Sequence, residues 1–320
     1  MALLPWFRSR PRRELHVAHF EGVLGTSLEL QIVAHSERAG QGAEEVVLLE
    51  IDRLEAVFNA YRPGSELRQW QETHGEAVAV SSELAGLLMR AEQWRVRSSG
   101  AFNPAVEAFS RLWADHAARA VPVEGADLAP LLKQIGGPLW EVDVESSTAR
   151  RLTTLPVTLN SIAKGFIIDA ACEVAAARAD VFEVMLNIGG DLRHAGTKAV
   201  PVAIANPRGD AENAAPADRI GLFNAGVATS GNYRRGFQIG EQWHSHVLDP
   251  RSGRPVEELV GVSVLAPDAA TADVLATAFS VLAPSQSLAM ADSLGDVGVL
   301  LIAANGERWE NGFWGRARGF

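Results

Sequence analysis

The chain has 320 residues, of which 47 % are hydrophobic and 21 % charged, a composition typical of a soluble globular protein with a large core. Its formal net charge of −10 argues against a nucleic-acid partner, because neutralising phosphates requires a concentrated basic surface. The single cysteine, Cys172, excludes an intramolecular disulfide framework and an all-thiolate zinc site. Its apolar setting, DAACEVAAA, indicates a small buried hydrophobe.

No segment of the sequence approaches the roughly 18 apolar residues of a transmembrane helix, so we expect no integral membrane segment. The N-terminal stretch MALLPWFRSRPRR has its few apolar residues before its basic cluster. A secretory signal has the opposite order and a longer apolar core. We therefore expect a cytoplasmic location, or a periplasmic one if an upstream leader is missing from this sequence.

The first half of the chain predicts two strands, two helices and a peripheral segment. Residues 14–34 nearly alternate between apolar and polar and are broken by glycines, which predicts two strands meeting at a turn. Helices are expected over about 42–59 and about 82–98, with Ser82 as the N-cap of the second. Residues 115–150 show little periodicity and predict a loop or insertion.

From residue 151 onward the pattern is clearer. Helices are expected at about 162–179 and 269–282, with a short one after Pro284. Strands alternate with these helices without a regular parallel βαβ rhythm, which predicts an α+β fold rather than a doubly wound sheet. The expected strands are 151–160, 181–188, 199–207, 237–240, 259–267 and 297–306.

Asp273 and Thr277 are four residues apart within DVLAT of the 269–282 helix. Side chains at this spacing lie on one face, so a carboxylate and a hydroxyl converge. Hard cations such as Mg²⁺ take oxygen ligands and keep few protein contacts, for which this pair is sufficient. The same spacing is also common among solvated residues of an exposed helix.

The helix that begins in NSIAKGFIID combines features of a phosphate site. Asn160 or Ser161 can cap it, Lys164 lies in its first turn, and Gly165 permits close approach of another backbone. Free N–H groups at a helix N-terminus beside a lysine suit a phosphate. An amphipathic helix with one exposed lysine is the alternative, and no glycine-rich Walker loop precedes this lysine.

Two turns, NIGGD at 187–191 and ATSGNYRRG at 228–236, offer backbone amides and hydroxyls. Paired glycines after a strand allow positive φ and close approach of a ligand. Each stretch also fits a plain tight turn.

The stretch WHSHVLDPRSGRP, residues 243–255, carries two histidines one residue apart. In an extended segment His244 and His246 point the same way, as two zinc ligands do. No third ligand lies at a recognisable spacing, and a histidine at a strand end also suits proton transfer. A purely structural role for both histidines remains a third interpretation.

Taken together and in order, these elements resemble the ApbE family, the FAD:protein FMN transferases. The resemblance covers about residues 18–305, leaving 1–17 and 306–320 as terminal tails. The matching landmarks are LGT at 24–26, YRPGSEL at 61–67, SGAFNPAVEAFSRLW at 99–113, LNSIAKGFIID at 159–169, NIGGDLRHAG at 187–196, VATSGNYRR at 227–235, HSHVLDPRSGRP at 244–255 and SVLAPDAATADVLATAFSVL at 263–282.

The resemblance implies a two-lobed α+β fold in which FAD lies in a cleft between the lobes and Mg²⁺ bridges its pyrophosphate. It also implies transfer of the FMN half of FAD to a threonine or serine hydroxyl of an acceptor flavoprotein, with release of AMP. The partners are then FAD and that acceptor.

The resemblance further implies roles for individual residues. Asp273, Thr277 and the backbone carbonyl of Ala163 become Mg²⁺ ligands. His246 becomes the catalytic group that accepts the proton of the acceptor hydroxyl, and His244 has no role. The FAD site comprises Thr26, Tyr61, Asn103, Lys164, Asp169, Thr229, Ser230 and Gly231, with Asn103 standing where the family pattern commonly has aspartate.

Three other functions compete with this interpretation. FAD pyrophosphate hydrolysis would use water in place of the acceptor hydroxyl, and AMP release without an acceptor would reveal it. A flavin-binding or flavin-delivery protein would bind FAD without turnover. A zinc hydrolase would use His244 and His246 and would contain stoichiometric zinc.

Overall fold

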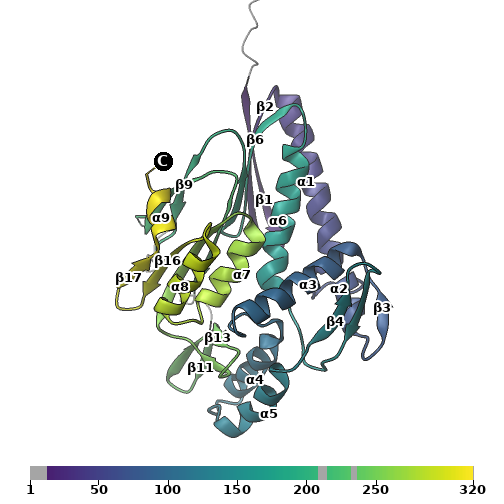
Figure 1. Cartoon of the computed structure of the whole chain (residues 1–320), viewed down its shortest axis with the longest axis vertical. Coiled ribbons are helices and arrows are strands. Elements are labelled where there is room, and N and C mark those ends of the chain that lie inside the picture. The colour runs from purple at the N-terminus through teal and green to yellow at the C-terminus, as the bar shows by residue number, and fades with distance from the viewer. Residues whose placement is uncertain (1–12, 208–214, 232–235, 320) are drawn as a thin grey trace, which may run out of the picture.

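The computed structural model describes residues 13–207, 215–231 and 236–319, and it has the expected α+β architecture (Figure 1). An eight-stranded antiparallel sheet forms its centre, in the order β1-β2-β6-β7-β10-β15-β16-β17. The strands are β1 (Glu14–Val23), β2 (Thr26–Ala34), β6 (Val181–Ile188), β7 (Asp191–Ala195), β10 (Gly226–Gly231), β15 (Leu259–Ala266), β16 (Gly298–Ala303) and β17 (Arg308–Glu310).

Four helices pack along one face of this sheet (Figure 1). On β2 the inward residues Leu28, Leu30 and Ile32 are fully buried, as the alternation in the sequence predicts. Long helices cover them because an apolar sheet face must be buried against another element. These helices are α1 (Glu37–Phe58), α6 (Asn160–Ala176), α7 (Ala269–Phe279) and α8 (Pro284–Leu294).

A smaller lobe follows α1 in the chain and occupies the lower part of Figure 1. Its three-stranded sheet has the order β3-β5-β4 and lies at the edge of the lobe, with α3 packed against it (Figure 1). Two short hairpins, β11–β12 and β13–β14, lie beside α4 and complete this end of the molecule (Figure 1). The elements are α2 (Glu66–Gln71), β3 (Ala77–Ala79), α3 (Ser82–Arg97), η1 (Pro104–Val106), α4 (Glu107–Ala118), α5 (Gly125–Ile135), β4 (Trp140–Asp143), β5 (Thr148–Arg151), β11 (Gly236–Ile239), β12 (Gln242–Ser245), β13 (Leu248–Asp249) and β14 (Arg254–Pro255).

Several local predictions were wrong. The expected loop over 115–150 contains α5, β4 and β5. The expected strand over 151–160 has only its first residue in β5. Ser81, not Ser82, caps α3 by accepting a hydrogen bond from the Leu84 N–H, and neither Asn160 nor Ser161 caps α6, whose N-cap is Leu159.

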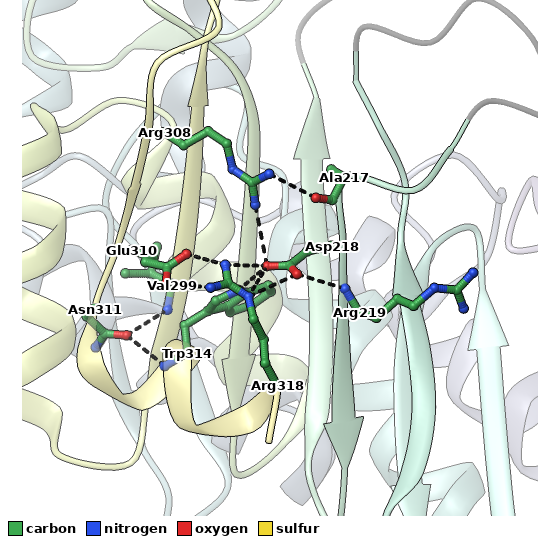
Figure 2. Close-up of polar contacts among 9 residues, drawn as sticks. All are labelled: Ala217, Asp218, Arg219, Val299, Arg308, Glu310, Asn311, Trp314 and Arg318. Carbon is green, nitrogen blue, oxygen red and sulfur yellow. Dashed lines mark hydrogen bonds and ion pairs between the residues drawn. The ribbon is translucent and has the colours of Figure 1, made fainter. Parts of the chain in front are cut away.

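The C-terminal segment expected as a tail is part of the fold. β17 pairs with β16, and α9 (Gly312–Ala317) buries Trp314 completely, against β8 (Val200–Ile204) and β9 (Asp218–Leu222) on the second face of the sheet. Figure 2 shows Asp218 of β9 accepting hydrogen bonds from Trp314 Nε1 at 2.9 Å and from Arg318 Nε at 2.8 Å. At the other terminus β1 begins at Glu14, inside the segment expected as an N-terminal tail.

Gly165 sets the separation of α6 and α7. A Cβ at this position would lie 2.5 Å from the carbonyl oxygen of Ala269, a distance that backbone atoms cannot tolerate. The close approach of another backbone predicted from the sequence is confirmed, and it brings the first turns of the two helices together.

Gly165→Ala is expected to destabilise the protein by about 1–3 kcal/mol, because the added methyl group forces packed helices apart. Gly86→Ala is the matched control, since Gly86 is helical in α3 and an added Cβ would meet nothing within 4 Å. That control is expected to be neutral or to stabilise by about 0.5–1 kcal/mol. Urea unfolding of the two variants measures the difference, and equal stabilities would contradict the packing argument.

Candidate functional site

A cavity of about 850 Å³ opens where α6, α7, two turns of the large sheet and the end of β10 meet the end of α1. It gathers residues that are distant in the sequence. Two of the predicted site residues, Asn103 and Asp169, do not line it. The other ten do: Thr26, Tyr61, Ala163, Lys164, Thr229, Ser230, Gly231, His246, Asp273 and Thr277.

Two helices supply the charged wall of the cavity. Ala163 and Lys164 lie in the first turn of α6, and Asp273 and Thr277 lie one turn apart on α7. The missing side chain of Gly165 allows these two sets to face each other across the helix contact. The i, i+4 spacing therefore places a carboxylate and a hydroxyl at one point of the cavity.

Asp273 is an unusual carboxylate. Burial, and then the negative charge of Asp191, raise its pKa to about 8, although Lys164 and the Gly165 N–H act in the opposite direction. Its Oδ2 atom is buried and accepts no hydrogen bond from any residue that the structure describes. A buried polar atom without a partner costs free energy, so this oxygen marks a place where a ligand would bind.

Asp191, which the sequence analysis did not select, is the second buried acid of the cavity. It begins β7, and its side chain is 3 % exposed and lies 2.7 Å from Lys164 Nζ. Burial raises its pKa, while Lys164 and the Thr229 N–H lower it. The only signal in the sequence was its place after the glycine pair of NIGGD, a stretch that also fits a plain turn.

The oxygen donors of the cavity suit a hard divalent cation. Asp273 offers a carboxylate oxygen that has no hydrogen-bond partner among the described residues, Thr277 a hydroxyl one helical turn away, and Ala163 lies on the facing helix turn. Mg²⁺ takes oxygen ligands and usually keeps several waters, so a small protein set is sufficient. Among the described residues no group of three histidine, cysteine or acidic side chains could hold a metal ion.

The two histidines occupy different environments. β12 ends at Ser245, so His244 lies within the strand whereas His246 follows it and lines the cavity. The ring of His244 packs on Trp113 at 5.0 Å, and its Nδ1 lies 3.8 Å from Glu257. The two side chains are therefore not a pair of ligands on one strand, which removes the geometric basis of the zinc interpretation.

Asp169 lies away from the cavity, contrary to its expected place in the FAD site. Its carboxylate accepts hydrogen bonds from the N–H groups of Ala269 at 2.8 Å and Ala270 at 2.9 Å, and Arg193 Nε lies 3.4 Å away. Burial raises its pKa to about 6 despite those hydrogen bonds. Asp169 therefore fastens the N-terminus of α7 to α6.

Asn103 is also outside the cavity lining. Its side chain is buried in the smaller lobe, where Oδ1 accepts a hydrogen bond from the Ala105 N–H and Nδ2 donates one to the Ile135 carbonyl at 3.3 Å. The residue caps η1 and ties it to the end of α5.

The mouth of the cavity carries an exposed aromatic ring. Tyr61 is 76 % exposed, and its hydroxyl accepts a hydrogen bond from Asn160 Nδ2 at 3.2 Å. On the opposite wall Gly189 has φ +60°, and a Cβ there would lie 2.7 Å from the Thr26 side chain. The glycine pair predicted from the sequence thus allows two sheet turns to approach each other beside the cavity.

The end of β10 adds neutral polar groups. Thr229 shares a hydrogen bond of 2.9 Å with Ser263 through its hydroxyl, and Ser230 and Gly231 follow it along the wall. The rest of the predicted turn, residues 232–235, lies outside the described residues.

Elsewhere the structure confirms that Cys172 is a buried residue, and burial raises the pKa of its thiol to about 12.

Within the described part of the chain, none of the helices has the length and apolar character needed to cross a membrane.

Metal-free protein is expected to lose stability as the pH rises from about 4 to about 8. Asp273 has a folded-state pKa above its unfolded value, so the folded state binds more protons in this range and its stability falls with increasing pH. Asp273→Asn should flatten this dependence. The measurement is the melting temperature of the wild type and of Asp273→Asn in the presence of a chelator, over this pH range. If the melting temperatures of the two proteins depend on pH in the same way, Asp273 does not have the raised pKa.

The fold and cavity together define an α+β ligand-binding protein whose site combines a lysine with buried carboxylates. The chain belongs to the ApbE family, whose family profile matches residues 24–301. The ApbE protein of Thermotoga maritima has a similar structure, with a TM-score of 0.82, 25 % identity, and coverage of 95 % of this chain and 99 % of that one. The apo flavinyl transferase ApbE of Pseudomonas stutzeri shares the fold, with a TM-score of 0.81, 24 % identity, and coverage of 96 % and 98 %.

Curated relatives include two FAD:protein FMN transferases. That of Vibrio cholerae is 27 % identical over 307 residues, which cover 92 % of this chain and 88 % of the relative. That of Rhodobacter capsulatus is 29 % identical over 290 residues, covering 89 % of this chain and 55 % of the relative. The chain therefore spans about half of the length of the Rhodobacter protein.

Proposed function

We propose that this protein is a Mg²⁺-dependent FAD:protein FMN transferase. It takes FAD as substrate, attaches the FMN half to a threonine or serine hydroxyl of an acceptor flavoprotein, and releases AMP. The names of the curated relatives support the transferase activity. The observation that carries the metal dependence is the buried Asp273 oxygen, which accepts no hydrogen bond from the part of the chain that the structure describes and shares one cavity with Thr277 and Lys164.

In the proposed reaction the acceptor hydroxyl oxygen attacks the phosphorus on the FMN side of the pyrophosphate. A new P–O bond forms, the bond to the bridging oxygen breaks, and AMP leaves with that oxygen. A ring nitrogen of His246 takes the hydroxyl proton, which makes the oxygen a stronger nucleophile. A bound Mg²⁺ would offset the negative charge on the pyrophosphate oxygens.

The protein's own groups orient the substrate. Lys164 supplies a positive charge near the diphosphate, and the ring of Tyr61 offers an exposed aromatic surface for the flavin at the mouth of the cavity. Thr229 and Ser230 offer hydroxyl groups on the β10 side. Such positioning is the main demand of phosphoryl transfer, in which the protein does little covalent chemistry.

The test combines the protein, FAD, Mg²⁺ and an acceptor flavoprotein. Transfer should give a fluorescent acceptor band that survives denaturation, with one AMP released per flavin attached. Omitting the acceptor distinguishes the alternatives, because AMP release then indicates FAD hydrolysis by water. FAD binding without AMP release under either condition would instead indicate a binding or delivery protein.

A further inference from the structure

A partly exposed lysine, Lys164, and a buried aspartate, Asp191, form an ion pair within the cavity. Lys164 Nζ lies 2.7 Å from Asp191 Oδ2, and the aspartate side chain is 3 % exposed. The N–H of Thr229 donates a hydrogen bond to this carboxylate. Asp191 is thus held from three elements, because it begins β7 and bonds to α6 and to β10.

The same lysine is close enough to Asp273 for its positive charge to act on that carboxylate. The Asp273 Oδ2 atom nevertheless accepts no hydrogen bond from the described residues. An ammonium group attracted by two carboxylates can approach either one, and here it lies against Asp191. Had it bonded to Asp273 instead, it would have covered the oxygen and placed a positive charge where a cation would bind.

We propose that Asp191 is a positioning residue that holds the Lys164 ammonium away from Asp273 and so keeps the Asp273 carboxylate open to a divalent cation. This inference rests on the proposed Mg²⁺ dependence and assigns to Asp191 a role that the resemblance does not give it. Mutation of the partners that orient the groups around a metal typically lowers metal affinity by about 10–100-fold.

Isothermal titration of the FAD-free protein with Mg²⁺ alone tests the inference in three variants. Asp191→Asn is expected to weaken Mg²⁺ binding by about 10–100-fold, since the released lysine turns to Asp273. Lys164→Met is expected to keep or tighten Mg²⁺ binding, because the competing cation is gone. The double variant is expected to bind Mg²⁺ as Lys164→Met does, which reverses the loss seen in Asp191→Asn.

This reversal separates positioning from other roles. A double variant that binds Mg²⁺ as weakly as Asp191→Asn would overturn the inference, since Asp191 would then act as a ligand or as a support of the fold. Unchanged affinity in Asp191→Asn would also overturn it. If Asp191→Asn does not fold because Lys164 loses its partner, the other two variants still decide the question. A double variant that binds Mg²⁺ more weakly than Lys164→Met would then overturn the inference.

Asp180→Asn is the matched control. Asp180 pairs with Arg178 at 3.0 Å, but its side chain is 40 % exposed and outside the cavity lining, so Mg²⁺ affinity should not change. Wild-type protein that binds no Mg²⁺ would overturn the inference. The three variants could show the expected Mg²⁺ affinities while the wild type transfers no flavin. That result would contradict the proposed function but would still support the role of Asp191.

Discussion

Asp273→Asn is expected to lower the rate of FMN transfer by about 100–1,000-fold while leaving the metal-free protein at least as stable as the wild type. The activity falls because an amide cannot supply the charge that a divalent cation requires. The stability is kept because asparagine is nearly isosteric and removes a buried acid that is destabilised by its burial and by Asp191. A residue that served packing alone would show the opposite pattern.

Two measurements check this expectation. Transfer rates at saturating FAD across a Mg²⁺ series measure the loss, and melting curves with and without Mg²⁺ measure the coupling. Mg²⁺ should raise the melting temperature of the wild type and leave that of Asp273→Asn unchanged, because binding to the folded state alone stabilises it. Asp115→Asn on the surface of α4 is the control, since its side chain is 62 % exposed and pairs only with Arg119 among the described residues.

A variant that transfers flavin at the wild-type rate, or that still gains stability from Mg²⁺, would refute the assignment of Asp273 as a metal ligand. Chelation of the wild type should reproduce the loss of activity, and added Mg²⁺ should reverse it. If chelation has no effect, the transfer does not depend on the metal.

The sequence predicted the large sheet well because its signal is local. In β6 and β15 the apolar residues form a continuous or alternating run bounded by turn residues, and both strands appear where they were expected. The stretch 151–160 shows how the same signal can mislead. Leu155, Val157 and Leu159 alternate and are all buried. Residues 152–159 nevertheless form no strand with any described residue and run as an extended connection between β5 and α6.

The helix α5 was missed because its local sequence signal is weak although the helix forms. Its apolar residues Leu128, Leu131, Leu132 and Ile135 have helical spacing, but residues 115–150 as a whole show little periodicity, which suggested a loop or insertion. Packing of that apolar face against the rest of the smaller lobe outweighs the local cost of the proline. Such tertiary contributions are not visible in a window of the sequence.

The sequence predicted those parts of the site whose residues lie close together in the chain. Asp273 and Thr277 are paired by the helix period, and the need for glycine at position 165 followed from its place beside a candidate site. Asp191 could not be found this way, because its importance depends on burial and on the position of Lys164. Asp169 does not line the cavity, which a motif could not reveal, because a resemblance gives a position in a motif but not the direction in which the side chain points.

His246→Ala is expected to lower the rate constant for FMN transfer by about 100–10,000-fold with little change in FAD affinity. His246 lines the cavity just after β12, within the group of residues proposed to hold the diphosphate. An imidazole that removes the hydroxyl proton contributes mainly to the transition state, so its loss should appear in kcat rather than in binding. The acid limb of the wild-type pH profile should disappear in the variant, since protonation of the imidazole no longer matters.

His244→Ala is the matched control for this variant. Its ring packs on Trp113 rather than in the cavity, so the substitution should reduce stability and leave kcat within a few-fold of the wild type. Added imidazole should restore part of the activity of His246→Ala, because a free base can enter the space of the deleted ring. Equal losses in the two histidine variants, or a retained acid limb in His246→Ala, would show that the proton goes elsewhere. The cavity would then hold FAD and the metal, and the base would have to come from the acceptor protein or from water.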